Sequence, residues 1–135
     1  MKGLKLIKAI SASAAVLCGF AIAAPAQTPE ATLLDGIMQG QWTLTDRSSG
    51  LPGKPLCLGN PELLLQIQHG ETSCTRYVIE NTPKKLRVSY KCRGAGHGVT
   101  EIKAESSTLL QISSQGIRNN APFSFNVEAR RTGSC

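Results

Sequence analysis

Apolar and polar residues alternate along most of the second half of the chain. Within residues 84–93, Leu86, Val88 and Tyr90 alternate with charged or polar neighbours, and residues 123–131 repeat the pattern. A period of two places the apolar side chains on one face of a β-strand and the polar ones on the other. The pattern predicts strands over residues 74–81, 84–93, 98–104, 108–115 and 123–131.

Two shorter strands are predicted before these, over residues 41–46 and 56–58. The connections are short and hold turn residues, as in Asn81-Thr82-Pro83, so consecutive strands should pair antiparallel. One apolar face per strand indicates a sheet with one buried face. The expected fold is mainly β: a strongly twisted or partly closed antiparallel meander of six or seven strands, with one or two short helices and two disulfides.

Two segments carry helix signals. Residues 27–40 begin with Thr28 as a cap and Pro29 in the first turn, and apolar residues between 33 and 38 follow at helical spacing. Before residues 61–68, Asn60 offers the same kind of cap, and His69-Gly70 provides a basic end and a terminator. Short helices are therefore predicted over 27–40 and 61–68.

The N-terminus has the pattern of a cleavable signal peptide. Lys2, Lys5 and Lys8 precede an uncharged stretch of small and apolar residues, which ends in Ala24-Pro25-Ala26. Cleavage is expected before Gln27, with Ala21-Ile22-Ala23 as a second choice. A retained anchor is disfavoured because the apolar run is shorter than a spanning helix. A lipoprotein signal at Cys18 is disfavoured because Leu17, rather than a small residue, precedes it.

Cleavage divides the chain into a signal peptide, 1–26, and a single mature β domain, 27–135, with no integral membrane segment. The net charge of the whole chain is +6, and loss of three lysines leaves 12 basic and 9 acidic residues, a net charge of +3. Basic residues are scattered, which argues against nucleic acid as a partner. The expected location is the periplasm of a Gram-negative bacterium, with secretion as the alternative.

Four cysteines remain after cleavage, and an even number in an oxidising compartment implies two disulfides. Their spacing does not fit zinc knuckles or redox motifs, so no metal or cofactor is expected. Aligning Tyr77 and Ile79 with the apolar face of residues 84–93 puts Cys74 on the face opposite Cys92, so a bond between those two would need a register shift or a bulge. The preferred pairing is Cys57–Cys74 with Cys92–Cys135, although the second bond requires a strongly coiled sheet.

The order of these motifs resembles an exported bacterial family, domain of unknown function 3617. The residues that carry the resemblance are Gly40-Gln41-Trp42, Cys57-Leu58, Cys74, Cys92 and the end of the chain, Arg130-Arg131-Thr132-Gly133-Ser134-Cys135. The resemblance implies an exported, disulfide-bonded, mainly antiparallel β domain. It implies no activity and no catalytic residues.

Few residues could carry chemistry. His69 and His97 are the only histidines, and no nucleophile-elbow motif accompanies them. His69 is best interpreted as a residue at a helix C-terminus, and His97 as part of the hairpin tip Gly94-Ala95-Gly96-His97-Gly98 rather than of a phosphate loop. No catalytic, cofactor-binding or metal-binding residues are predicted.

Two classes of function remain. The favoured hypothesis is a non-catalytic envelope module, which binds a small apolar ligand or an envelope protein. A purely structural or inhibitory envelope protein cannot be separated from it by sequence. The alternative is a small periplasmic hydrolase or metal-dependent enzyme, which would need His69 or His97 in a cleft beside a serine or a carboxylate.

Overall fold

The computed structural model describes residues 32–135. The predicted signal peptide, 1–26, and the start of the first predicted helix lie outside the described residues. Among residues 32–135, no helix has both the length and the apolar composition needed to cross a membrane.

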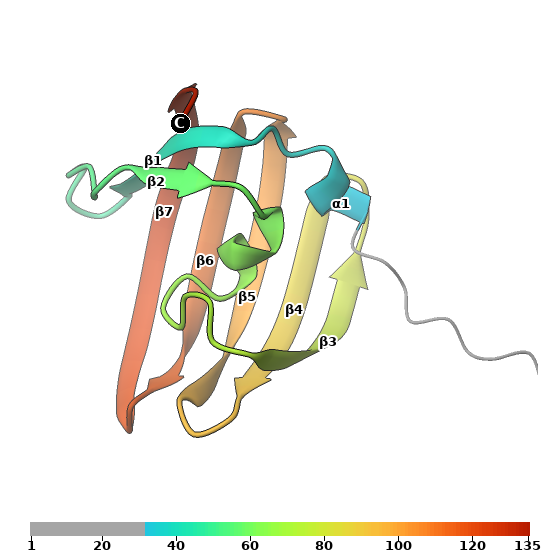
Figure 1. Ribbon diagram of the computed structural model, residues 1–135, viewed down its shortest axis with the longest axis vertical. Helices are drawn as coiled ribbons and strands as arrows, with labels where there is room; N and C mark the ends of the chain where they lie inside the picture. The colour runs from blue at the N-terminus through green and yellow to red at the C-terminus, as the bar shows by residue number, and fades with distance from the viewer. Residues whose placement is uncertain (1–31) are drawn as a thin grey trace, which may run out of the picture.

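Seven antiparallel strands form one open sheet, in the order β2-β1-β7-β6-β5-β4-β3 (Figure 1). The strands β3 to β7 form the predicted meander, and the hairpin of β1 and β2 joins it beside β7. The expectation of a mainly β fold with seven strands is confirmed. The strands are β1 (Gly40–Asp46), β2 (Leu56–Leu58), β3 (Cys74–Asn81), β4 (Lys85–Cys92), β5 (Gly96–Ser106), β6 (Leu109–Arg118) and β7 (Ala121–Gly133).

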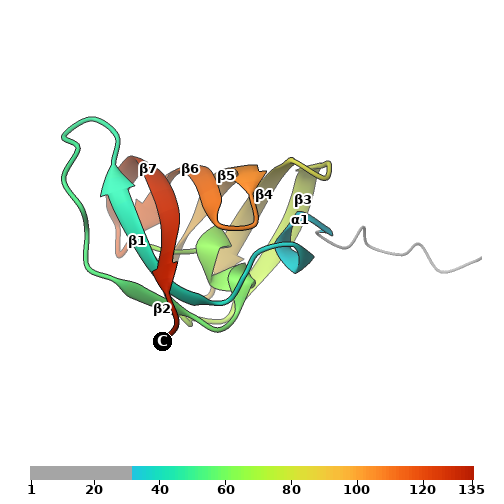
Figure 2. The same cartoon turned by 90° about the horizontal axis from the view of Figure 1, so that it is seen from above.

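The sheet is strongly curved, and the segment between β2 and β3 crosses its concave side (Figure 2). That segment contains a short 3-10 helix, η1 (Pro61–Leu65), while the α-helix α1 (Thr32–Asp35) lies by β3 and β4. The core fills the space between the sheet and these elements. Its most deeply buried members come from η1 and from nearly every strand: Trp42, Leu58, Leu64, Leu65, Leu86, Val88, Ile102, Leu110, Ile112 and Ala129.

Both predicted helical segments contain a helix, and each helix ends earlier than expected. The Asn60 side chain accepts a hydrogen bond from the Glu62 amide at 3.0 Å and Pro61 occupies the first turn, as the capping pattern predicts. The helix then ends after Leu65 instead of reaching residue 68, because the Gln66 side chain turns into the interior. Of residues 27–40, only Thr32–Asp35 are helical among those described.

The preferred disulfide pairing is wrong. The bonds are Cys57–Cys135 and Cys74–Cys92. Cys74 lies directly opposite Cys92. A bulge in β3 between Val78 and Glu80 changes the pairing by one residue between the turn and the cysteines. This is the irregularity that a Cys74–Cys92 bond was expected to need.

The second bond follows from the position of β1. Gln41 pairs with Cys57 on one side and with Gly133 on the other, so β1 brings β2 and the end of β7 within reach of each other. Cys92 on β4 is three strands away from β7. Local alternation could not show that the N-terminal hairpin adds to β7.

The expected facing of β3 is also wrong. Tyr77 and Ile79 were placed on the buried face, but their exposed fractions are 72% and 49%. Arg76 and Val78 face the concave side instead, opposite Tyr90 and Val88. The apolar faces predicted for β4 and β7 are confirmed, with Leu86, Val88, Tyr90 and Val127 buried.

Candidate binding cleft

A cleft of about 840 Å³ lies on the concave side, between α1, η1 and the pair β3–β4. Buried Leu65 and Val88, together with half-buried Val78, give it an apolar floor. Leu34 and Ile37 supply an apolar wall on the α1 side. The remaining lining comprises Pro61 and the polar residues Asp35, Gln39, Asn60, Glu62 and Arg76. The cleft therefore combines an apolar floor with a charged rim.

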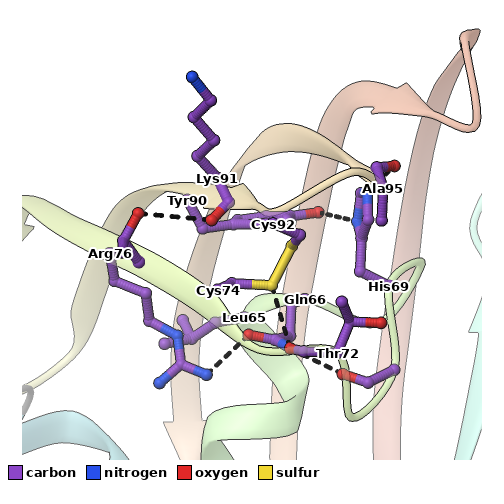
Figure 3. The surroundings of a disulfide bond; sticks show 12 residues. Leu65, Gln66, His69, Thr72, Cys74, Arg76, Tyr90, Lys91, Cys92 and Ala95 are labelled. Atoms are coloured by element: carbon purple, nitrogen blue, oxygen red, sulfur yellow. Dashed lines mark hydrogen bonds between the residues drawn. A yellow bond between two sulfur atoms is a disulfide. The ribbon is translucent and has the colours of Figure 1, made fainter.

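Arg76 forms the boundary of the cleft on the β3 side. Its guanidinium donates a hydrogen bond to Gln66 Oε1 at 2.7 Å and pairs with the Glu62 carboxylate at 2.9 Å. Both partners belong to the segment that crosses the sheet, and Figure 3 shows the bond between Arg76 and Gln66. A second hollow lies beyond Arg76 and is lined by Glu62, Gln66 and Glu71, among others. Arg76 therefore lies between the two hollows while it contacts both Glu62 and Gln66.

The Gln66 side chain makes hydrogen bonds within the crossing segment and with β3. Its exposed fraction is 2%, and its amide nitrogen donates to the carbonyls of Gly70 and Thr72, each at 2.7 Å. With the bond from Arg76, the side chain makes three hydrogen bonds. This fully satisfied amide explains why the helix stops after Leu65, since Gln66 turns inward to close the following loop.

His69 lies in a buried polar cluster further along the same segment. Its Nε2 is 3.1 Å from the carbonyl of Ala95 and 3.2 Å from that of Ile117, so this nitrogen carries a hydrogen. In the neutral ring, Nδ1 then accepts a hydrogen bond from the Tyr90 hydroxyl at 3.1 Å. Both ring nitrogens of His69 are engaged, and neither bonds a serine or a carboxylate.

The cluster continues from Tyr90 into β5 and β6. Burial raises the pKa of the Tyr90 hydroxyl, and a hydrogen bond with Ser114 acts in the opposite direction. Ser114 lies 2.7 Å from the Thr100 hydroxyl, which donates to the Leu65 carbonyl at 2.7 Å. The buried hydroxyls thus tie the end of η1, and with it one wall of the cleft, to the centre of the sheet.

The other residues with possible chemistry stay apart from the cleft. His97 is exposed on the outer face of β5, beside the hairpin tip 94–96. No group of three or more histidine, cysteine or acidic residues within 32–135 is arranged to hold a metal. Glu101 on the outer face pairs with Lys103 at 3.3 Å and Lys85 at 3.4 Å.

Searches against protein-family models, curated proteins and solved structures found no match for this chain. The resemblance to domain of unknown function 3617 therefore stays a prediction.

Sequence reasoning did not single out the residues that form the cleft. Arg76 and Val78 were assigned to the polar face of β3, because Tyr77 and Ile79 looked like its buried residues. Gln66 had no distinguishing signal, since a glutamine at the end of a helix is usually exposed. Within the buried cluster, Tyr90 was expected as a core residue, and His69 was the one residue considered for chemistry. The burial of His69 differs from its expected role at a helix end.

Proposed function

We propose that the protein is a non-catalytic, exported envelope module that binds an apolar group of a ligand or partner in this cleft. The observation that carries the proposal is the size and lining of the cleft. Its volume of about 840 Å³ falls within the usual range for ligand sites. Such sites also share its arrangement, an apolar floor with a few convergent polar groups at the rim.

The disulfide-bonded cysteines support an exported location. Two disulfides are typical of exported proteins in an oxidising environment. We place the protein in the periplasm of a Gram-negative bacterium, after removal of residues 1–26, and we propose its membership in the family it resembles. The alternative of a histidine-based hydrolase draws no support from His69, whose ring is occupied by structural hydrogen bonds.

The proposal is tested with a neutral apolar fluorophore, N-phenyl-1-naphthylamine, and with a pair of adjacent substitutions. Val78→Trp fills the cleft from its floor, whereas Ile79→Trp adds the same bulk beside it on the exposed side of β3. We expect saturable binding to the wild-type protein and to Ile79→Trp, and none to Val78→Trp.

A second blocking variant shows whether a loss of binding in Val78→Trp comes from the filled cleft or from misfolding. Gln39→Trp narrows the cleft from an exposed position, so it should abolish probe binding without disturbing the core. Unfolding curves verify that each variant is folded. Lack of binding by the wild-type protein, or undiminished binding by both blocking variants, would refute the proposed site.

A further inference from the structure

The cleft opens beside a strand that has only one neighbouring strand within residues 32–135. β3 pairs with β4 and is the last strand of the sheet at that side. A free edge of this kind exposes backbone donors and acceptors that can pair with another extended chain. Exposed apolar side chains on β3 offer further contact surface to such a chain. Of the four large hydrophobic residues that are exposed within 32–135, two, Tyr77 and Ile79, belong to this strand.

The register shows which backbone groups face outward. The Cα atoms of Cys74 and Cys92 are 4.0 Å apart, which is the close spacing of a pair that exchanges no backbone hydrogen bonds. Alternation then directs the amides and carbonyls of Thr75 and Tyr77 to β4, and those of Cys74, Arg76 and Val78 to the open side. The bulge after Val78 limits the regular free edge to residues 74–78.

The surroundings of this edge are acidic. The side chains that line the cleft and the adjoining hollow include Asp35, Glu62 and Glu71, against one cation, Arg76. Arg76 is already paired with Glu62. The acidic excess contrasts with the positive net charge of the whole chain. An approaching segment with a lysine or an arginine would complement it.

We infer that the occupant of the cleft is an extended segment of another exported protein, which adds as a strand beside Cys74–Val78. The inference rests on the proposed function and names its partner. One side chain of the segment, apolar, enters the cleft over Val78. A basic side chain two residues away faces the same side, since side chains two apart share a face. It lies beside Arg76, where Glu62 and Glu71 supply two carboxylates to one guanidinium. The residue between them lies beside Tyr77 on the outer face.

The test uses the capped peptide Ser-Thr-Leu-Thr-Lys-Thr-Ser and the intact mature protein. Binding is followed by amide hydrogen exchange, and we expect exchange to slow at Arg76 and Val78 while Thr75 and Tyr77, already bonded to β4, change little. Two further peptides carry N-methyl groups on the backbone of alternate residues. One is methylated at the leucine and the lysine, and the other at the three threonines. Strand addition predicts that only one of these two peptides loses binding.

A peptide with glutamate in place of lysine tests the charge, and we expect it to bind at least about tenfold more weakly. Equal affinity would overturn the basic preference. If the fluorophore binds in the cleft but the peptide does not slow amide exchange at Arg76 and Val78, the inference is overturned and the proposed function stands. If neither the fluorophore nor the peptide binds, the inference and the proposed function are both overturned. Protection of the same two amides that grows with protein concentration alone would identify a second copy as the occupant and would also overturn it.

Discussion

At the scale of single residues, the interior is held by polar side chains whose hydrogen bonds are matched. The exposed fractions of Gln66, His69 and Thr100 are 2%, 7% and 0%, yet each has partners at hydrogen-bonding distance. Removing one partner leaves a buried group unsatisfied, which costs more than a typical hydrogen bond contributes. The position of η1 over the sheet therefore depends on these bonds as well as on apolar packing.

The Tyr90 hydroxyl is the central link in that cluster. Tyr90→Phe removes the donor to His69 Nδ1 and the partner of Ser114, so we expect the free energy of unfolding to fall by about 1–3 kcal/mol. Urea unfolding measures the change. Tyr77→Phe is the matched control, because Tyr77 is exposed and should lose less than about 0.5 kcal/mol. Equal losses in the two variants would show that the cluster is not needed for stability.

Asp46 shows a second residue-scale effect, at the surface. Its Oδ1 accepts hydrogen bonds from the Ser48 hydroxyl at 2.5 Å and from the Ser49 amide at 2.8 Å, and these lower the pKa of the carboxyl to about 2. A lowered pKa means that the ionised form stabilises the fold above about pH 4. That contribution is lost as the pH falls through about 2.

Ser48→Ala removes the largest of these contributions, so the pKa of Asp46 should rise toward the ordinary value of 3.8. Carbon-detected NMR titration of the carboxyl reports the pKa directly. The melting temperature of the wild-type protein should exceed that of Asp46→Asn at pH 5, and the gap should narrow at pH 2. A gap that stays constant over this range would contradict the assignment.

At the scale of elements, two glycines face each other in the ladder where the buried cluster lies. Gly98 on β5 lies opposite both Tyr90 and Gly116 in the ladder. A Cβ at Gly98 would lie 2.6 Å from the Tyr90 hydroxyl oxygen and 2.7–2.9 Å from ring atoms. The Tyr90 ring therefore occupies the space that a side chain at residue 98 would need, and it covers the glycine.

Gly98→Ala should displace the ring and destabilise the protein by about 1–3 kcal/mol. Gly59→Ala is the control, because no atom lies within 4 Å of the added Cβ and the backbone there needs no positive φ. That control should change stability by less than about 1 kcal/mol. Thermal unfolding compares the two. A neutral Gly98→Ala would mean that the ring can move without cost.

The strands were predictable from alternation to within a few residues, because the buried faces of β4 and β7 read as a period of two. β3 was misread because alternation alone cannot tell which of two partly apolar faces is buried. Tyr77 and Ile79 outrank Arg76 and Val78 in hydrophobicity, but η1 and the residue after it give Arg76 its partners Glu62 and Gln66 on the concave side. Those partners lie 10 and 14 residues away, where sequence pattern carries no information about contact.

At the scale of the whole molecule, the two disulfides secure opposite sides of the sheet. Cys57–Cys135 links β2 to the chain end across a separation of 78 residues, and Cys74–Cys92 links β3 to β4 across 18. In the chain-entropy model, the longer loop contributes about 4.5 kcal/mol and the shorter about 3 kcal/mol. The concave side and its cleft lie between these two linked pairs of elements.

Replacing Cys57 and Cys135 with alanine should therefore destabilise the protein by about 4–5 kcal/mol in denaturant unfolding. The connectivity itself is checked by digestion after glutamate without reduction, since glutamates separate all four cysteines in the sequence. Mass spectrometry should find Cys57 linked to Cys135 and Cys74 to Cys92. Peptides that join Cys57 to Cys74 would contradict the structure.

The central claim is that the cleft between η1, α1 and β3–β4 is the binding site. A smaller apolar hollow of about 260 Å³, lined by Leu51, Ile67 and Phe125 among others, is the competing position. The most direct measurement is the set of nuclear Overhauser contacts between bound N-phenyl-1-naphthylamine and assigned methyl groups. Contacts to Val78 and Val88 are the predicted result, and contacts confined to Leu51 and Ile67 would contradict the claim.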